Sequence, residues 1–292
     1  MTEGGPGAPG PSRDAGRGSR ALGNRGVLVS SASTVLFFAV IAVVVVLSPG
    51  SAVVAERFLS PQNLWQSLVG SGSNPSVLGA FWLNVKIFVV AEVFILVLAL
   101  VIAVVRGIPG PVFFPFRLVA IAYTDLFRGV PLILVLYMIG FGVPGLGLGF
   151  ISYLPDVVYG VISLVLVYSA YVSEVYRAGI ESVHESQNTA ARSLGLTRLQ
   201  SLRFVVLPQA IRRVIPPLLN DFIGLQKDTA LVSVLGSIEA ARAAQIYSAS
   251  EFNYSSYVVA AFLFVLITIP LARFTDRLIA RDKRRREAGA LA

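Results

Sequence analysis

The chain has 292 residues, of which 55% are hydrophobic and 14% are charged, and its mean hydropathy is +0.75. Soluble domains are about 45–50% apolar and about 25% charged, so a single folded core could not bury this much apolar surface. The composition therefore predicts a membrane-embedded chain. Cysteine is absent and His184 is the only histidine, which excludes disulfides, thiolate metal sites and a histidine metal cluster. In a membrane protein the net charge of +8 matters through its distribution among loops, and we expect no nucleic-acid partner.

Six apolar stretches are long enough to cross a bilayer, which takes about 20 residues for about 30 Å of hydrocarbon. In chain order they are residues 27–47, 87–105, 118–141, 157–176, 214–235 and 254–272. The stretch 214–235 carries three ionisable residues together with Pro216 and Pro217, and the other five carry at most two. We therefore expect an all-α integral membrane protein with six transmembrane helices, the fifth bent or broken at its prolines. Gly129 and Pro131 should interrupt the third helix in the same way.

Six crossings place both termini on one side of the membrane, and the basic residues identify that side, because cytoplasmic loops retain Lys and Arg. Of the 24 basic residues, 19 fall in segments on the side of the termini. Only Arg57 and Arg242 fall on the opposite side, and the remaining three lie in or beside spans. We expect both termini to be cytoplasmic.

The two ends of the chain are basic. Residues 1–26 are rich in Gly, Pro, Ser and Arg and have few apolar residues to bury, so we expect a disordered tail. Residues 277–292 form a second basic tail, which is typical of a segment that faces lipid headgroups and fixes topology. The stretch 27–47 is longer than the core of about 7–15 residues in a signal peptide, so we expect a retained first span.

The longest expected cytoplasmic connection, between the fourth and fifth spans, has the pattern of two helices. Residues 187–194 are compatible with a helix, and Gly195 supplies the stop that follows many helix C-termini. Residues 199–206 have apolar positions at spacings of three and four, and Pro208 should end this second helix. The pattern predicts a helix-turn-helix beside the membrane, which serves as an interfacial anchor or as a docking element for a partner.

The same connection carries a recognisable signature. The stretch Thr189-Ala190-Ala191-Arg192-Ser193-Leu194-Gly195, followed by Leu207-Pro208-Gln209-Ala210, resembles the EAA signature of the membrane subunits of bacterial ABC importers. Neighbouring motifs resemble those of the polar amino acid branch: Phe127 to Leu132, Ala170-Tyr171 with Glu174, Arg177 to Ile180, and Lys227 to Val234. The similarity covers roughly residues 80–280, with several spaced motifs in the family's order.

The resemblance implies the permease subunit of an ATP-driven importer for a polar amino acid in the bacterial cytoplasmic membrane. Its five-helix domain would occupy residues 80–276, with a coupling loop at 181–210, and residues 27–47 would be an added first span. The implied partners are two ATPase subunits, a second permease subunit that is a copy or a paralogue, an extracytoplasmic solute-binding protein and membrane lipid. The chain contains no Gly-x-x-x-x-Gly-Lys-Ser/Thr run, so ATP and Mg²⁺ would be bound by the ATPase, and this chain would be neither an enzyme nor a cofactor-binding protein.

In this family the signature loop is a coupling helix that sits in a cleft of the ATPase. Ala190 and Ala191 would allow close packing, Gly195 would make the turn and Leu194 would anchor the loop. Thr189 stands where the family usually has Glu. A hydroxyl hydrogen bond of about 1 kcal/mol would there replace a charge-assisted bond about twice as strong.

Five ionisable residues fall within the expected spans, where a charge costs about 2.5–3.5 kcal/mol at a helix centre. They are Arg128, Glu174, Asp221, Lys227 and Asp228. One interpretation is that both signs of charge line or gate a path for a zwitterionic amino acid, and the other is that these residues pair between helices. An ion-coupled secondary amino acid transporter would use the same charges and is the alternative function. Such folds commonly have inverted repeats, and the two halves of this chain show no convincing repeat.

Overall fold

The computed structural model describes residues 24–290 except residue 184. The described residues form helices and loops, with no strand among them beyond an isolated bridge between Ser71 and Asn74. The expected all-α class is confirmed. The expectation of a disordered N-terminal tail falls mainly on residues 1–23, which lie outside the described residues.

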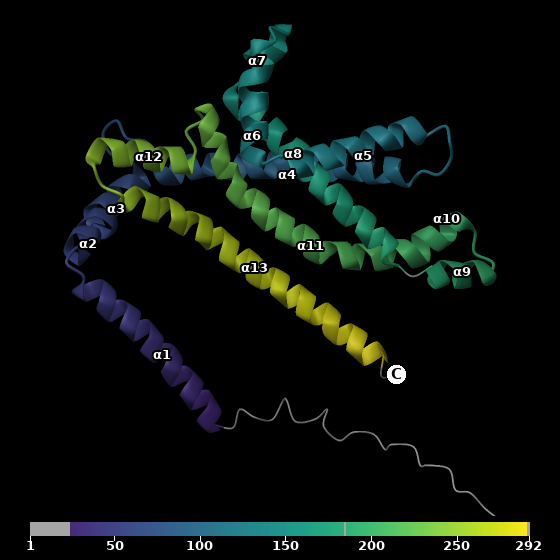
Figure 1. Cartoon of the computed structure of the whole chain (residues 1–292), viewed down its shortest axis with the longest axis horizontal. Helices are drawn as coiled ribbons and strands as arrows, with labels where there is room; N and C mark the ends of the chain where they lie inside the picture. The colour runs from purple at the N-terminus through teal and green to yellow at the C-terminus, as the bar shows by residue number, and fades with distance from the viewer. Residues whose placement is uncertain (1–23, 184, 291–292) are drawn as a thin grey trace, which may run out of the picture. The chain divides into compact units, whose positions relative to one another are not determined.

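Figure 1 shows the helices in chain order. The α-helices are α1 (Asn24–Leu47), α2 (Ser51–Leu59), α3 (Pro61–Val69), α4 (Val77–Gly107), α5 (Phe114–Gly129), α6 (Leu132–Tyr137), α7 (Val143–Gly145), α8 (Asp156–Glu181), α9 (Glu185–Ser193), α10 (Arg198–Ser201), α11 (Leu207–Asp228), α12 (Ala240–Glu251) and α13 (Ser255–Ala290). The structure also has two π-helical turns, η2 (Met138–Gly142) and η4 (Leu202–Val206). It has two 3₁₀ turns as well, η3 (Gly149–Tyr153) and η5 (Thr229–Leu235).

The chain divides into two units, residues 1–56 and 57–292. In the first unit, the segment Val29–Leu47 of α1 is 19 residues long and none of it is buried inside the chain. A helix that is apolar on all sides needs an apolar surrounding, which fits a lipid bilayer.

Four helical segments are long and apolar enough to cross a membrane, namely Val29–Leu47, Val77–Gly107, Asp156–Glu181 and Ser255–Arg281. A fifth crossing is formed if Phe114–Gly129 and Leu132–Gly145 count as one span bent by 107°. The chain is therefore a multi-pass helical membrane protein with four or five candidate spans in the described residues. The sixth crossing, expected at 214–235, and the side of the termini stay predictions.

The interruption expected in the third span is confirmed at the junction of α5 and α6. Helix α5 ends at Gly129, and Val130 has extended backbone angles (φ −97°, ψ 130°). The ring of Pro131 disfavours a helical conformation for the residue before it, which accounts for the break. Helix α6 then starts at Leu132 in a new direction.

Helix α11 is continuous across Pro216 and Pro217, so a break at these residues is wrong, and a bend there stays a prediction. The two prolines have no N–H, so they cannot donate to the carbonyls of residues 212 and 213 four positions earlier. The helix changes character only at Thr229, where η5 begins and runs to a left-handed Gly236.

Pro208 also does not end a helix. Helix α10, the π-helical turn η4 and α11 follow one another without a gap from residue 198 to 228. A proline inside an α-helix removes one hydrogen bond and its ring collides with the carbonyl four residues earlier. The wider turn of η4 directly before Leu207 and Pro208 coincides with the place where this conflict arises.

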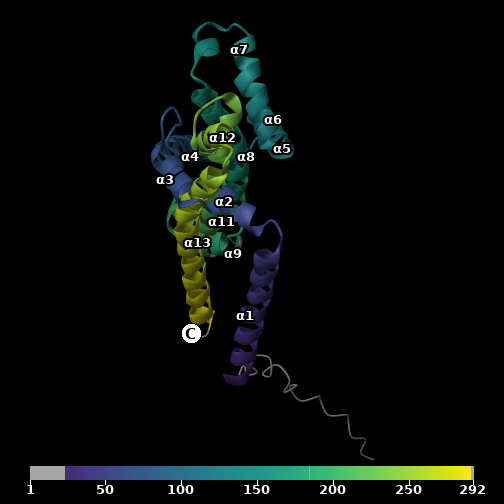
Figure 2. The same ribbon diagram turned by 90° about the vertical axis from the view of Figure 1, so that its left-hand side faces the viewer.

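Helix α4 is central in the second unit and packs mainly against α8. One of its faces is buried at positions that recur every four residues, as expected for one side of a helix. These positions are Ile87, Ala91, Ile95 and Ala99, and they join Leu164 and Val172 of α8 and Leu225 of α11 in the larger apolar core. A smaller core joins the start of α4 to α12 and α13. In both views of Figures 1 and 2, the segment α6–α7 lies far from the α9–α10 loop.

A buried polar side chain of α4 connects three elements. Asn84 is 2% exposed, and its Nδ2 donates to Thr229 Oγ1 of η5 at 3.1 Å and to Glu239 Oε2 at 2.9 Å. Its Oδ1 accepts from the N–H of Ala240 at 3.0 Å. Glu239 in turn accepts from the N–H groups of residues 241 and 242. The first N–H groups of α12, which have no partner inside the helix, are thus all satisfied by these two side chains.

Candidate functional site

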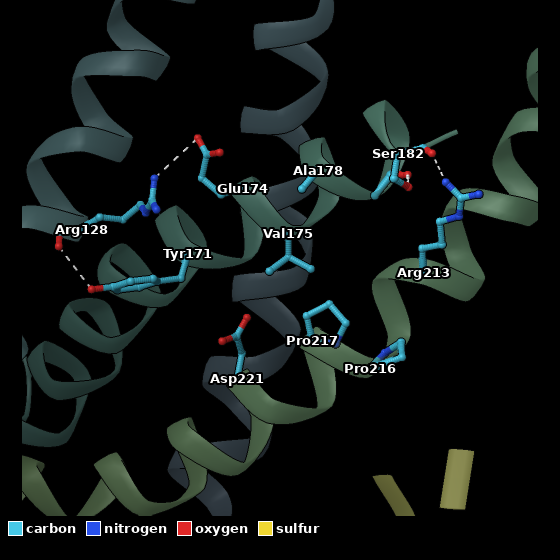
Figure 3. A pocket seen from close by; sticks show the side chains of 11 residues that line it. Arg128, Tyr171, Glu174, Val175, Ala178, Ser182, Arg213, Pro216, Pro217 and Asp221 are labelled. Atoms are coloured by element: carbon cyan, nitrogen blue, oxygen red, sulfur yellow. Dashed lines mark hydrogen bonds and ion pairs between the residues drawn. The ribbon is translucent and has the colours of Figure 1, made fainter. Parts of the chain in front are cut away.

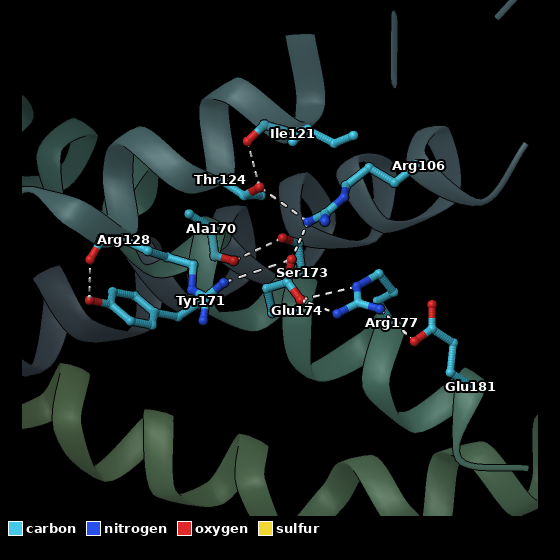
Figure 4. Close-up of polar contacts among 10 residues, drawn as sticks. All are labelled: Arg106, Ile121, Thr124, Arg128, Ala170, Tyr171, Ser173, Glu174, Arg177 and Glu181. Carbon is cyan, nitrogen blue, oxygen red and sulfur yellow. Dashed lines mark hydrogen bonds and ion pairs between the residues drawn. The ribbon is translucent and has the colours of Figure 1, made fainter. Parts of the chain in front are cut away.

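Helix α8 carries a carboxylate that faces three guanidinium groups (Figure 4). The side chain of Glu174 is 16% exposed and pairs with Arg106 at the end of α4 and with Arg177 one turn along α8. Arg177 donates from Nε and Nη2 to Glu174 Oε2 at 3.0 and 2.7 Å. Arg128, in the last turn of α5, is the third, with its Nη1 3.8 Å from Glu174 Oε1. The carboxylate is therefore already compensated by two closer partners before Arg128 is counted.

A cavity of about 660 Å³ lies beside this cluster, between α5, α8 and α11. Figure 3 shows Arg128 and Tyr171 at one side of it and Arg213 with Ser182 at the other. Arg213 donates to the carbonyl of Ser182. The polar lining consists of Arg128, Tyr171, Glu174, Ser182, Arg213 and Asp221. Both signs of charge thus face this cavity.

A second cavity of about 460 Å³ reaches the break between α5 and α6. It is lined by residues 129–132 of the break and by Arg128, Tyr168, Tyr171, Asp221 and Asp228. Asp228 Oδ2 accepts from the hydroxyl of Tyr168 at 2.8 Å. Asp221 Oδ2 is buried and has no hydrogen-bond partner among the described residues. A buried carboxylate oxygen without a donor is costly and is free to accept one from a ligand.

The broken end of α5 is fixed to α8 by an aromatic side chain. The hydroxyl of Tyr171 donates to the carbonyl of Arg128 at 3.3 Å, and the Arg128 guanidinium lies over the Tyr171 ring at 5.9 Å from its centroid. The last carbonyls of a helix have no intrahelical donor, so the hydroxyl supplies the bond that the break removes.

The structure brings four of the five predicted charges together. Arg128 and Asp221 line both cavities, Glu174 lines the larger one and Asp228 the smaller one. Lys227 is exposed and lines neither of these cavities. Of the five, Arg128 and Glu174 form an ion pair with each other, whereas the structure gives none for either aspartate within its described residues. Among the residues that the structure describes, no three His, Cys, Asp or Glu side chains are grouped as a metal ion would require.

Three residues that contribute to this site were not among the predicted site residues, although Tyr171 was part of a family motif. Arg106 was counted as a topological loop residue, yet its side chain is only 14% exposed and also donates to Thr124 of α5. Tyr168 and Tyr171 line the smaller cavity. For the two tyrosines the available signal was their spacing, because residues 168, 171, 174 and 177 are polar side chains three positions apart.

The predicted coupling loop is a helix, turn and helix at one end of the second unit (Figure 1). Gly195 ends α9 with φ +87°, and its N–H bonds to the carbonyl of Arg192 while that of Leu196 bonds to Ala191. These two bonds and the left-handed glycine define a Schellman cap. The next helix begins with a reciprocal pair, since Thr197 Oγ1 accepts from the Gln200 N–H and Gln200 Oε1 from the Thr197 N–H.

The five predicted coupling residues differ in exposure. Thr189 and Ala190 face outward, and Ala191 is 5% exposed, buried within the loop. Leu194 is 84% exposed, so it anchors nothing inside this chain.

The fold and this site define a multi-pass helical membrane protein with charged cavities beside an interrupted helix. Residues 21–285 match the family of binding-protein-dependent transport system inner membrane components, and the chain belongs to that family. It is 33% identical over 207 residues to the arginine transport system permease protein ArtQ of Bacillus subtilis, covering 71% of this chain and 92% of that one. It is 36% identical over 177 residues to the probable glutamine ABC transporter permease protein GlnM of the same organism, covering 60% of this chain and 79% of that one.

Solved structures agree with this assignment. The chain superposes on an amino acid ABC transporter crystallised with histidines with a TM-score of 0.64 at 32% identity, covering 70% of this chain and 93% of the other. The MetNI methionine ABC transporter, at 19% identity and a TM-score of 0.57, shares the fold over 70% of this chain and 95% of its own. The resemblance to amino acid ABC importer permeases is thereby confirmed, and the alternative of an ion-coupled secondary transporter loses its support.

Proposed function

We propose that this chain is the permease through which an ATP-driven importer moves a polar amino acid across the bacterial cytoplasmic membrane, with the two cavities as part of the path. The observation that carries the proposal is the pair of neighbouring cavities at a broken helix, which offer both signs of charge beside candidate membrane spans, where charges are costly. Broken helices and buried charges are the means by which transporters bind substrates near the bilayer midplane.

The charges suit a zwitterion. The side chain of Arg128 is 43% exposed, and its guanidinium can take the substrate carboxylate. The free Oδ2 of Asp221 or the carboxylate of Asp228 can take the ammonium group. The cavity volumes of about 460 and 660 Å³ lie within the range of about 300–1,000 Å³ that small-ligand sites occupy.

In the proposed assembly the chain pairs with a second permease subunit, a copy or a paralogue, and with two ATPase subunits and a solute-binding protein. Six crossings place both termini in the cytoplasm, so the Gly195 loop faces the ATPase. The outward Leu194 and the capped turn support this contact. ATP and Mg²⁺ bind to the ATPase subunits, and this chain contributes no catalytic residue and holds no cofactor or metal.

The test is a pull-down of the tagged chain in mild detergent, followed by reconstitution of the co-purifying proteins into vesicles. We expect an ATPase subunit to co-purify and its ATP turnover to rise with one amino acid and its solute-binding protein. Uptake of the same labelled amino acid should require ATP on the side of the membrane where the Gly195 loop lies. Supplying ATP either inside or outside the vesicles therefore also tests the orientation. A single-chain oligomer that takes up an amino acid with an ion gradient alone would overturn the proposal.

A further inference from the structure

The two cavities share one wall. Arg128, Tyr171 and Asp221 line both of them, and each cavity extends from this wall in a different direction along α8. The larger cavity continues past Ala178 to Ser182, near the start of the α9 loop. The smaller one continues towards Val167 and the α5–α6 break. Because the same three side chains line both cavities, a movement of these side chains can change whether the cavities form one passage or two chambers.

Two contacts hold this wall in place. The Tyr171 hydroxyl is bonded to the Arg128 carbonyl, and the Tyr171 ring lies under the Arg128 guanidinium. Figure 4 shows both side chains reaching across from α5 and α8. The hydroxyl therefore fixes the backbone end of Arg128, while the ring attracts its charged end only weakly.

The guanidinium of Arg128 has only weak attachments. Its Nη1 is 3.8 Å from Glu174, which is beyond hydrogen-bond distance, and that carboxylate keeps Arg106 and Arg177 as closer partners. Arg128 is also more exposed than Arg106, with 43% against 14% of the side chain. The guanidinium can thus turn away from Glu174 without leaving a buried carboxylate unpaired, so it is the movable part of the wall.

We propose that Tyr171 is the positioning residue of a gate: it holds Arg128 across the path between the two chambers, and the gate opens when the guanidinium turns to a substrate carboxylate. This inference rests on the proposed transport function. A carboxylate that accepts two parallel N–H bonds from the guanidinium outcompetes an aromatic ring at 5.9 Å from it. Substrate in either chamber would therefore release the wall, and an empty path would stay closed.

The absence of cysteine provides a direct test, because one introduced cysteine is the only thiol of the chain. Ala178→Cys places a thiol in the larger chamber alone and Val130→Cys places one in the smaller chamber alone. Each is labelled with a membrane-impermeant maleimide, added to one side of sealed vesicles that hold the whole complex without substrate or ATP. With Tyr171 present, we expect each thiol to react from one side only, and the two from opposite sides.

In the Tyr171→Ala background, each thiol should also react from the far side, at a rate at least tenfold above that with Tyr171 present. Tyr171→Phe keeps the ring and loses only the hydroxyl bond, so it should give a smaller increase and guards against misfolding of the alanine variant. Tyr176→Phe is the matched control, since Tyr176 also lies on α8 and lines neither chamber. It should leave the labelling unchanged.

Unchanged far-side labelling in both Tyr171 variants would overturn the gate, and so would an equal increase in Tyr176→Phe. ATP-driven uptake of a labelled amino acid by the unmodified complex in the same vesicles separates the two proposals. If uptake occurs while the labelling is unaffected by Tyr171, the gate alone is wrong. If the unmodified complex shows no such uptake, the proposed function is wrong regardless of the labelling.

Discussion

Gly179 lies where α8 and α11 approach closely. A Cβ atom at this position would overlap Val214 Cγ2, and Val214 is a buried β-branched side chain that has little freedom to move. Gly→Ala in a helix normally stabilises by about 1 kcal/mol, but overpacking costs about 1–3 kcal/mol and should dominate. We expect Gly179→Ala to lower the unfolding midpoint of the purified protein in detergent.

The controls for this prediction use the same substitution elsewhere. Gly107 is the last residue of α4, and an added Cβ there meets nothing within 4 Å, so Gly107→Ala should not lower the midpoint. Adding Val214→Ala to Gly179→Ala should recover part of the loss, because it empties the space that the new methyl group needs. An unchanged midpoint in Gly179→Ala would show that the two helices can separate freely at this point.

Gly195 is constrained by its backbone and not by its surroundings. Its φ is +87°, and an added Cβ would meet nothing within 4 Å. A left-handed conformation costs an L-residue about 1–2 kcal/mol, and a β-branched residue more, so Gly195→Val should distort the Schellman cap. We expect normal membrane insertion and abolished uptake. Gly195→Asn, which tolerates this conformation, should keep most of the uptake, and normal uptake in Gly195→Val would show that the turn is not needed for coupling.

At the scale of elements, Asn84 connects α4 to η5 and to the N-terminus of α12. Asn84→Ala would leave the Ala240 N–H without its acceptor and would remove a donor from the buried carboxylate of Glu239. Each unsatisfied buried group costs about 1–3 kcal/mol, so this variant should lose several kcal/mol of stability and most of its expression in the membrane. Ser163→Ala is the comparison, because the buried Ser163 hydroxyl bonds only to a carbonyl of its own helix. Equal stability of the two variants in thermal unfolding would contradict the bridging role.

The effect of a proline on its helix could be predicted from the sequence at one position and not at three others. Pro131 was a reliable signal because it restricts Val130 directly before it and lies two residues after Gly129, where α5 ends, and both effects are local. Pro208, Pro216 and Pro217 look the same in the sequence but lie inside a continuous helical stretch. Packing of α11 against α8 and α13 holds that stretch together, and a π-helical turn relieves Pro208. Such compensation depends on tertiary contacts, which no local pattern contains.

For the whole molecule, hydropathy located the long apolar helices, because the length of a span is set by the bilayer and can be counted along the chain. It was less informative for α11, because Arg213, Asp221 and Asp228 of this helix face cavities formed with α5 and α8. Charge within an expected span also identified Arg128, Glu174, Asp221 and Asp228 as residues that line a path or pair between helices. It could not separate Lys227 from Asp228, since neighbouring residues on a helix point in different directions and only the packing decides which one faces the cavity.

Transport by the assembled importer should depend on this difference between the charges. Arg128 lines both cavities and faces the expected path of the substrate carboxylate, whereas Lys227 lines neither. Loss of a hydrogen bond to a charged group costs about 1.5–3 kcal/mol, so Arg128→Ala should lower the efficiency of uptake by about 10–100-fold. The protein should still fold, because Glu174 keeps Arg106 and Arg177 as partners.

Initial rates of labelled amino acid uptake over a range of concentrations measure the uptake efficiency of both variants. Lys227→Ala should stay within about threefold of the unmodified complex. Equal losses in the two variants would mean that the cavities seen in one subunit are not the path, and that the exposed face of α11 around Lys227 forms it together with the second permease subunit.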